Sequence, residues 1–415
     1  MGSTKPYEIS RHLLFDAYKR VKANGGGSGI DNVSLKDFEE NYKDNLYKIW
    51  NRMSSGSYFP PAVKLVEIPK NGGGKRPLGI PTVGDRIAQM AAVLVISPEL
   101  EQIFHADSYG YRVGRSAHDA VGKARERCFR YDWVLDMDIS RFFDTIPHDL
   151  LMKAVERHVT EKWILLYINR WLKVPYRLSD GSVQERTMGV PQGSVIGPVL
   201  ANLYLHYAFD KWMDITHPDT PFERYADDTV CHCRSREEAE RLRDRVSERM
   251  KECGLSLNLE KTRIVYCKDG LRKEDHDKIS FTFLGYEFRP RKAKVKGRKA
   301  FNGFLPAVSS KAKKKMNEEI RSWQLHRHAG STMRQVAWRI NPIVRGWITY
   351  YGKYYGSSLK SYLVHLNHRL AGWVCSKYKR FRGRRWAAYY WLGKIAAKNP
   401  GLFFHWQWGV TPPAR

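Results

Sequence analysis

The segment FERYADDTVCHC, residues 222–233, is the strongest local indication of the fold. Aromatic, valine and cysteine positions flank two adjacent acids, Asp227 and Asp228, so we expect a β-hairpin with both carboxyls at its turn. Aspartate is a favoured turn residue, so two such acids alone indicate only a solvated loop. A second stretch, WVLDMDISRFF at residues 133–143, reads as a buried strand that runs into a turn near Asp138. Together the two stretches predict acids from different strands that approach one point.

A cluster of carboxylates has a definite chemical use. Like charges repel, so the group is costly unless cations bind, and hard oxygen ligands favour Mg²⁺. Two such ions about 3.5–4 Å apart can stabilise the attacking and leaving oxygens of phosphoryl transfer. We therefore expect two Mg²⁺ ions, with Mn²⁺ as a substitute, at Asp138, Asp227 and Asp228. Asp136 and Asp144 are close rivals for Asp138.

Other segments suited to phosphate chemistry lie in order around these acids. KNGGGKRPLGIP (70–81) offers cations and a glycine turn that can fold over a triphosphate. GVPQGSVIGPVLANLYL (189–205) offers a glycine-rich approach and the amide of Gln192. GLSLNLEKT (254–262) and FTFLGYEF (281–288) follow. The order of the whole set is far more specific than the paired acids alone.

This ordered series resembles the reverse transcriptase family, and most closely the reverse transcriptase/maturase encoded by group II introns. AYKRVKANGGGSGIDNVSLKDF (17–38) resembles the N-terminal extension of that family. YGYRVGRSAHDAV (109–121) resembles the segment between its fingers and catalytic strands. INPIVRGWITYYGKYY (340–355) resembles its maturase-specific, or X, domain, which serves as the thumb. The resemblance spans nearly the whole chain.

The resemblance implies an α+β right-hand polymerase, with fingers and a palm that carry antiparallel sheet, followed by a C-terminal α-helical thumb/maturase (X) domain. We expect the N-terminal extension at 1–60 and the fingers and palm at 61–290. The basic stretch RKAKVKGRK (291–299) is the expected domain boundary. The X domain would occupy 300–385, and a basic, aromatic tail suited to DNA would occupy 386–415.

The resemblance also implies residue roles. Asp138, Asp227 and Asp228 would hold the metal ions and form the catalytic centre, and the D-I-x-x-x-F spacing of the family favours Asp138 over its rivals. The primer grip would be Leu284, Gly285 and Tyr286. The nucleotide-binding residues would be Lys70, Arg76, Phe143, Gln192 and Lys261.

Each nucleotide-binding role has its own chemistry. Lys70 and Arg76 would hold the incoming triphosphate, with Lys75 as the alternative to Arg76. Phe143 would lie beneath the sugar and leave no room for a 2′-hydroxyl, which predicts selection of deoxynucleotides. Gln192 would position template and nucleotide. Lys261 would protonate the pyrophosphate leaving group.

The charge of the chain is unevenly distributed. The 415 residues carry 71 basic and 43 acidic side chains, a net charge of +28, which favours a polyanionic partner. Residues 289–415 hold 28 of the basic side chains, only 2 of the acidic ones and 8 of the 13 tryptophans. Such a segment suits phosphate contact and stacking on exposed bases. The expected RNA- or DNA-binding residues are Arg345, Lys353, Lys379, Arg380, Arg382, Arg384 and Arg385.

We therefore expect an RNA-directed DNA polymerase that also acts as a maturase for its parent group II intron RNA. Its partners would be that intron RNA, an RNA template with a DNA primer, target DNA and deoxynucleoside triphosphates. The sequence contains no run of 18 apolar residues, so we expect no membrane partner. A bacterial cytoplasmic protein, associated with the nucleoid when bound to DNA, is expected. A homodimer is left open.

Two other functions stay open at this point. The chain could be a splicing-only RNA-binding maturase, or a related polymerase recruited to host defence or repair. The paired cysteines and histidines that mark a C-terminal endonuclease do not occur in this sequence. We therefore expect DNA synthesis to be primed by a nascent DNA strand or at another nick. The fragment Cys231-His232-Cys233 has no second ligand pair, so we expect no zinc there.

Overall fold

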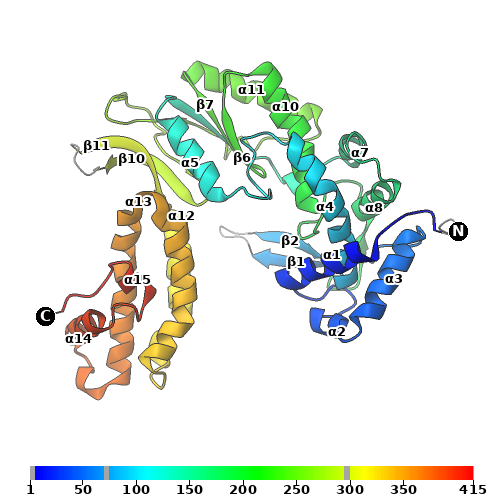
Figure 1. Ribbon diagram of the computed structural model, residues 1–415. Coiled ribbons are helices and arrows are strands. Elements are labelled where there is room, and N and C mark those ends of the chain that lie inside the picture. The colour runs from blue at the N-terminus through cyan, green and yellow to red at the C-terminus, as the bar shows by residue number, and fades with distance from the viewer. Residues whose placement is uncertain (1–4, 70–73, 294–299, 415) are drawn as a thin grey trace. The chain divides into compact units, whose positions relative to one another are not determined.

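The computed structural model describes residues 5–69, 74–293 and 300–414, which form two compact units (Figure 1). The first unit consists of residues 1–120, 135–233 and 237–263, and the second of residues 121–134, 234–236 and 264–415. The predicted nucleotide contact Lys70 lies outside the described residues. Within the described residues, no helix is both long and apolar enough to cross a membrane.

The first unit combines helices with short strands. Helix α5 (Ala117–Cys128) and the strands β3 (Trp133–Met137) and β8 (Arg263–Tyr266) have residues in both units, and the first residue of α11 (Arg236–Glu252) belongs to the second unit. Its other elements are α1 (Arg11–Asn24), α2 (Leu35–Glu40), α3 (Tyr42–Ser54), β1 (Val63–Pro69), β2 (Lys75–Ile80), α4 (Val83–Ile103), α6 (Phe142–Thr145), α7 (His148–Glu156), α8 (Lys162–Lys173), β4 (Tyr176–Arg177), β5 (Val183–Gln184), α9 (Gly197–Leu205), the π-helix η1 (His206–Asp210), α10 (Lys211–Thr216), β6 (Phe222–Tyr225), β7 (Asp228–Cys233) and α11 (Arg236–Glu252).

Two groups of strands organise the first unit. One sheet has the order β2-β1-β4-β5, with β1 antiparallel to β2 and parallel to β4. The other contains the neighbours β6-β7-β3, and β6 and β7 form an antiparallel hairpin. This is the hairpin that the alternating pattern of residues 222–233 predicts.

The N-terminal helices of the first unit are amphipathic. The buried side chains of α1 are Leu14, Ala17, Tyr18 and Val21, as the 3.6-residue period predicts. The sequence SLKDFEENYKDNLYKIWNRM (34–53) predicts one helix after Ser34, but the structure has two helices that meet at Asn41, where φ is −127° and ψ is 39°.

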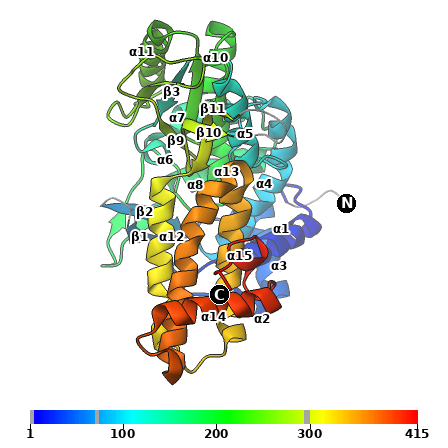
Figure 2. The same ribbon diagram turned by 90° about the vertical axis from the view of Figure 1, so that its left-hand side faces the viewer.

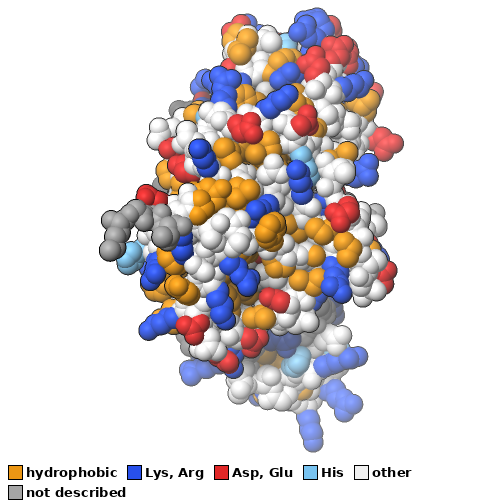
Figure 3. Space-filling view, turned by 90° about the vertical axis from the view of Figure 1, so that its right-hand side faces the viewer, with side chains coloured by type: hydrophobic (Ala, Val, Ile, Leu, Met, Phe, Trp, Pro, Cys, Tyr) orange, Lys and Arg blue, Asp and Glu red, His pale blue; other side chains and the backbone are white. Residues whose placement is uncertain are grey.

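Helix α4 is largely buried in the first unit. The sequence suggests an interruption near Pro98, but the helix continues through it to Ile103. Ile96 and Leu100 are buried on either side of the proline, so packing offsets the lost backbone hydrogen bond. Figure 3 shows basic and acidic side chains interspersed over the face on which α3 and α8 lie in Figure 1, in keeping with the near-neutral composition of this part of the chain.

The second unit joins a small sheet to a helical bundle. Its sheet has the order β11-β10-β9. Besides the elements shared with the first unit, its elements are β9 (Phe281–Phe283), β10 (Tyr286–Ala293), β11 (Phe301–Val308), α12 (Ser310–Ser322), the 3₁₀ turn η2 (Leu325–Arg327), α13 (Met333–Lys377), the 3₁₀ turn η3 (Lys379–Phe381), α14 (Arg385–Lys398) and α15 (Phe404–Gln407).

The expected domain boundary at 291–299 is wrong. Strands β10 and β11 pair antiparallel over eight positions, from Tyr286 opposite Val308 to Ala293 opposite Phe301. The basic stretch therefore joins two partner strands of one sheet instead of two domains. The high density of positive charge made this stretch resemble a linker, but the residues after it form β11, most of whose side chains are buried.

Helix α13 is a helical hairpin and not one straight rod. Tyr355 has non-helical angles, φ −131° and ψ 66°, and Gly356 follows it. Arg339 donates to the ring of His328, and the indole of Trp373 donates to the carbonyl of the same residue, each at 3.0 Å. A straight helix would separate positions 339 and 373 by about 51 Å, so the chain reverses between them. The two arms and α12 lie side by side in Figure 2.

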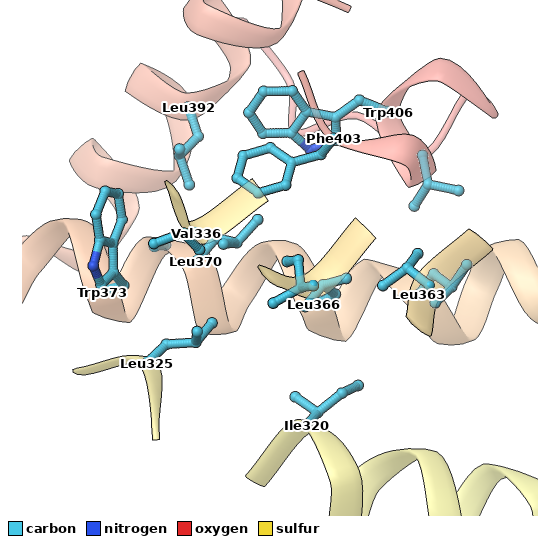
Figure 4. Packing of buried hydrophobic residues seen from close by; sticks show 14 of the residues in the cluster. Ile320, Leu325, Val336, Leu363, Leu366, Leu370, Trp373, Leu392, Phe403 and Trp406 are labelled. Carbon is cyan, nitrogen blue, oxygen red and sulfur yellow. The ribbon is translucent and has the colours of Figure 1, made fainter. Parts of the chain in front are cut away.

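One hydrophobic core holds the helical bundle together. Figure 4 shows Val336 and Leu370 from the two arms of α13 beside Phe403 and Leu392. Helix α14 and residues 403–410 contribute buried side chains to this core. The predicted boundary at residue 385 therefore does not coincide with a break in the fold, and residues 386–415 are not a separate tail.

Candidate functional site

The hairpin turn carries two of the predicted acids. Tyr225 pairs with Asp228, which leaves Ala226 and Asp227 as the two turn residues. Ala226 has a φ of +57°, the left-handed region that an L-residue other than glycine rarely adopts. Positive φ at the first of two turn residues is the pattern of the type II′ turns that suit a twisted hairpin. The turn presents the carboxyls of Asp227 and Asp228 at the end of the β6–β7 pair.

The third acid follows the neighbouring strand. Asp138 comes directly after β3, which lies next to β7 in the sheet. Its carbonyl accepts from the amide of Asn258 at 2.8 Å, and the amide of Ser140 donates to the carbonyl of Ser256 at 2.8 Å. The carboxylate is 32% exposed and forms an ion pair at 3.0 Å with the ammonium of Lys261. The segment 256–261 thus fixes both the backbone and the charge of Asp138.

The acids lie close enough to affect one another's ionisation. Burial, and then the charge of Asp138, raise the pKa of Asp227, while Arg76 and Lys261 oppose the rise. Burial raises the pKa of Asp136 to about 7, with further contributions from Asp228 and Asp138. Asp136 and Asp138 are two residues apart and so point to the same side of their strand.

The structure separates the two rivals of Asp138. Asp136 lies within β3, two residues before Asp138, and the charges of Asp228 and Asp138 act on it. Asp144 instead accepts a hydrogen bond at 3.0 Å from the side-chain amide of Gln192. Asp144 therefore lies in α6 and is bonded to the loop that begins at Gly189.

The donor set fits a hard divalent cation. Burial and then the charge of Asp138 raise the pKa of Asp227, and a lysine ammonium already compensates Asp138, so these carboxylates lie within electrostatic reach of one another. In the described parts of the chain, no three acidic, histidine or cysteine side chains are grouped closely enough to hold one metal ion in common. The chemistry of a metal site is therefore present without a closed set of three ligands.

Two of the predicted nucleotide residues, Arg76 and Gln192, lie on segments that hydrogen bonds connect. Arg76, on β2, donates through Nε to the side-chain oxygen of Gln192. The backbone joins the same segments, since the amide of Gly79 donates to the carbonyl of Gln192 at 2.7 Å. The alternative cation Lys75 forms an ion pair with Glu67. This favours Arg76 over Lys75 as the cation near the glycine-rich loop.

Phe143 lies in the short helix α6 and is 8% exposed. Its ring packs edge-on against Phe142, with 5.3 Å between centroids. Its carbonyl accepts from the amide of Val190 at 2.7 Å, which ties α6 to the loop that holds Gln192. The ring is thus held in place, as a residue that shapes a sugar pocket requires.

The predicted primer grip is a turn in the second unit. Leu284 and Gly285 both have positive φ, +50° and +81°, between strands β9 and β10. Tyr286 is fully buried among tyrosines, and its hydroxyl donates to the carbonyl of Tyr350. The hydroxyl of Tyr350 donates in turn to the carbonyl of Leu284 at 2.7 Å. Tyr286 therefore anchors the turn, and only Leu284 and Gly285 are exposed enough to contact nucleic acid.

The seven predicted nucleic-acid contacts in the second unit are all exposed. Three are held over aromatic rings, which fixes their direction: Arg345 over Phe404 at 4.9 Å, Lys353 over Tyr354 at 5.7 Å and Arg380 over Phe381 at 4.7 Å. Arg385 also donates to the carbonyl of His368 at 3.2 Å. The side chains of Lys379, Arg382 and Arg384 complete the set.

Sequence reasoning missed two features near the acids. Tyr111 has a φ of +57°, and burial and then the charge of Asp227 raise its pKa, so its phenol lies within electrostatic reach of that acid. Arg224 and Asp210 form a fully buried ion pair beneath the hairpin turn. A signal existed in each case: Tyr111 lies in the segment YGYRVGRSAHDAV, and Arg224 is a charge inside an apolar strand next to the acids.

Comparison with known sequences places these features in a family. A sequence model of the reverse transcriptase (RNA-dependent DNA polymerase) family matches residues 68–288, and one of the group II intron maturase-specific domain matches residues 313–391. Protein YkfC of Escherichia coli K12 is 31% identical over 300 residues, which cover 62% of this chain and 74% of YkfC. The group II intron-encoded protein LtrA of Lactococcus lactis is 30% identical over 210 residues, 50% of this chain but only 34% of LtrA.

Among solved structures, telomerase from Candida albicans, in complex with a fragment of telomeric RNA, aligns with a TM-score of 0.48 at 12% identity. The alignment covers 91% of this chain and 68% of the telomerase chain. The two family models together contain the acids, the glycine-rich loop, the primer-grip turn and most of the helical bundle. The predicted fold class, an α+β polymerase region followed by a helical maturase region, is confirmed. The chain belongs to the reverse transcriptase family, in its group II intron-encoded reverse transcriptase/maturase branch.

Proposed function

We propose that this chain copies RNA into DNA at Asp138, Asp227 and Asp228, and that it binds its parent group II intron RNA to assist splicing. One observation supports the polymerase site above all. Within the span matched by the reverse transcriptase family, two neighbouring strands bring these acids into one electrostatic group, with the Lys261 ammonium 3.0 Å from Asp138. Acids held this close favour cations, which a phosphoryl transfer requires.

The reaction is attack of a primer 3′-hydroxyl on the α-phosphate of a deoxynucleoside triphosphate, with release of pyrophosphate. Two Mg²⁺ ions held by Asp138, Asp227 and Asp228 would supply charge stabilisation for the attacking and leaving oxygens, and Mn²⁺ is a chemically similar substitute. Lys261 contributes a positive charge beside Asp138 and a proton donor for the departing pyrophosphate. Its exposed side chain, 65% accessible, can move between these two partners.

The remaining residues orient the nucleotide. Arg76 binds the triphosphate through its planar guanidinium, and Gln192 holds that guanidinium in position from the neighbouring loop. Asp144 fixes the orientation of the Gln192 amide, since it accepts from the amide nitrogen at 3.0 Å. The packed ring of Phe143 excludes a 2′-hydroxyl and so selects deoxynucleotides.

The maturase role rests on the second unit. The maturase-specific model matches residues 313–391, and the exposed cations of this region face solvent with almost no acids nearby. Phosphate contacts from these cations would stabilise the folded intron RNA, which performs the splicing chemistry itself. Target DNA and a template–primer duplex are the other proposed partners, and the proposed setting is the bacterial cytoplasm, at the nucleoid when DNA is bound.

The test of the polymerase site is primer extension on an RNA template with Mg²⁺ and deoxynucleotides. Asp227→Ala and Asp138→Asn should each lower the rate by about 10³-fold, because each removes charge stabilisation made at the transition state. Asp219→Asn, an exposed acid of the same unit, is the matched control and should extend as the wild type does. An Asp227→Ala variant that keeps its extension activity would show that the site lies elsewhere.

The maturase role needs a separate assay. Self-splicing of the parent intron RNA should be accelerated by the wild type and equally by Asp227→Ala, because the acids take no part in RNA binding. A wild-type protein that extends primers but leaves the splicing rate unchanged would favour a polymerase recruited to host work. A protein that assists splicing without any extension would instead favour a splicing-only maturase.

A further inference from the structure

A buried charged network lies directly beneath the acidic turn. Arg224 and Asp210 are both 0% exposed. The guanidinium binds the carboxylate in a fork, with Nε donating to Oδ1 at 2.7 Å and Nη2 donating to Oδ2 at 2.6 Å. Its remaining nitrogen, Nη1, donates to the side-chain oxygen of Asn202 at 3.0 Å and to the carbonyl of Ala226 at 3.1 Å.

The last of these bonds reaches the turn itself. The carbonyl of Ala226 belongs to the peptide that joins Ala226 to Asp227, so the bond fixes the orientation of the peptide plane that precedes Asp227. Ala226 has a φ of +57°, a conformation that costs an L-residue strain. A charge-assisted hydrogen bond to its carbonyl is the kind of contact that holds such a conformation in place.

A neighbouring loop closes the network from the other side. The amide of Arg224 donates to the carbonyl of Asp107 at 2.9 Å, and the amide of Tyr109 donates to the carbonyl of Arg224 at 2.8 Å. A Cβ at Gly110 would lie 2.4 Å from the amide nitrogen of Ala226, so only glycine fits there. The side chain of Asn202 donates to the carbonyl of Gly110 at 2.7 Å. The turn is therefore packed between Gly110 and Arg224.

The π-helix η1 explains how one helix supplies both partners of Arg224. Eight residues of regular α-helix would rotate Asp210 by about 80° from Asn202. The wide turn over His206–Asp210 contains about one residue more than an α-helical turn, so Asp210 and Asn202 are separated by only about 20° of rotation around the helix axis. The helix irregularity thus places a carboxylate and an amide on the same side, toward Arg224.

Stability alone does not account for this network. An ion pair taken fully out of water loses hydration that its mutual attraction recovers only in part, and apolar residues of similar size often serve as well. What apolar residues cannot supply is a donor to the Ala226 carbonyl. From this geometry we propose that Arg224, held by Asp210 and Asn202, is a positioning residue that fixes the turn of Asp227 and Asp228 for nucleotide addition.

This inference rests on the proposed function for its kinetic test, but not for its structural one. The double variant Arg224→Met, Asp210→Leu replaces the ion pair by apolar side chains and leaves no unpaired charge. Its melting temperature should stay within about 4 °C of the wild type. Its kcat for nucleotide addition should fall by about 10²-fold with little change in the KM for deoxynucleotide, because a displaced turn misaligns the acids.

A third substitution separates positioning from general weakening. Adding Ala226→Gly to the double variant lets the turn adopt its left-handed φ without strain, and should restore about 10-fold of the lost kcat. Glu223→Gln is the matched control: Glu223 precedes Arg224, is equally buried and pairs with His232 at 2.6 Å instead of the turn. This control should leave both kcat and turn dynamics unchanged.

Amide hydrogen exchange decides the structural part whatever the enzyme does. In the double variant, amides of residues 225–229 should exchange at least about 10-fold faster, while those of α4 and α9 keep their rates. Unchanged exchange in the turn, or an Ala226→Gly addition that restores no activity, would overturn the inference. A wild type without any extension would refute the proposed function, and the exchange result would still decide whether Arg224 holds the turn.

Discussion

The exposed cations after α13 offer a quantitative test of RNA binding. Arg380 and Arg385 also contact the protein through Phe381 and His368, so their removal would disturb the fold. Lys379, Arg382 and Arg384 are exposed and suit a cleaner substitution, each to Gln. If each contacts one phosphate, the slope of log K against log salt should fall by about 2 to 3, at 0.7 to 0.9 per contact. At 0.15 M salt this corresponds to a loss of about 50- to 150-fold in intron affinity.

The assay is equilibrium binding of the parent intron RNA across a salt series, with single-nucleotide extension measured on a short, saturating primer–template. Nucleotide addition should change far less than intron binding, because the substituted cations lie in the second unit and the acids in the first. The matched control is Arg241, Arg245 and Lys251→Gln on α11, which removes the same charge from the first unit. An unaltered slope, or an equal loss in the control, would refute phosphate contact by the three cations.

Three further predictions concern the first unit. Asp85 is 1% exposed, and burial raises its pKa from 3.8 to about 6 despite three hydrogen bonds, so the folded state holds its proton more tightly than the unfolded chain. Its contribution to the free energy of unfolding is therefore present below pH 3.8 and is lost as pH rises through about 6. The loss amounts to about 3 kcal/mol. Asp85→Asn should abolish that part of the pH dependence in urea unfolding. Arg76→Lys should raise the KM for deoxynucleotide by about 10- to 100-fold, since a lysine loses the guanidinium fork. Phe143→Val should lower discrimination against ribonucleotides by about 10- to 100-fold in competitive incorporation.

A specific result would contradict each of these three predictions. Equal pH profiles for wild type and Asp85→Asn would show that the carboxyl does not titrate between pH 4 and 6. A lowered kcat with an unchanged KM in Arg76→Lys would show that Arg76 stabilises the transition state and does not contribute to ground-state binding of the nucleotide. Unchanged sugar discrimination in Phe143→Val would exclude this ring as the gate.

The acidic turn could be predicted because its causes are local. Alternation of apolar residues fixes the hairpin, and the short turn leaves Asp227 and Asp228 at its tip. Asp138 was predictable for the same reason, as an acid at the end of a buried strand. Its choice over Asp136 depended on the family spacing, because both acids point to one side of β3 and both lie in the cluster.

The network beneath the turn could not be predicted from local pattern. Arg224 meets Asp210 and Asn202 only because η1 widens one helical turn, and nothing in residues 206–210 indicates such a change of register. A lone arginine in an apolar strand indicates a buried charge, but not its partner. The partner is set by the packing of separate elements.

The second unit shows a similar limit. The 3.6-residue period runs from Ile340 to Tyr355, which correctly predicts a helix but conceals the reversal at Tyr355. The pairing of β10 with β11 was hidden by the basic stretch between them, since charge density there reads as a linker. Both errors come from long-range packing: the core formed by α12, α13 and α14, and the strand pairing, override local composition.

The most direct test of the central claim is incorporation of a single deoxynucleotide opposite an RNA template by the full chain with Mg²⁺. We expect one added nucleotide dictated by the template, with the rate reduced about 10³-fold in Asp227→Ala and unaffected in Asp219→Asn. Template-directed addition that persists in Asp227→Ala and Asp138→Asn would contradict the assignment of the site. A wild-type chain that adds no nucleotide at all would contradict the assignment of the function.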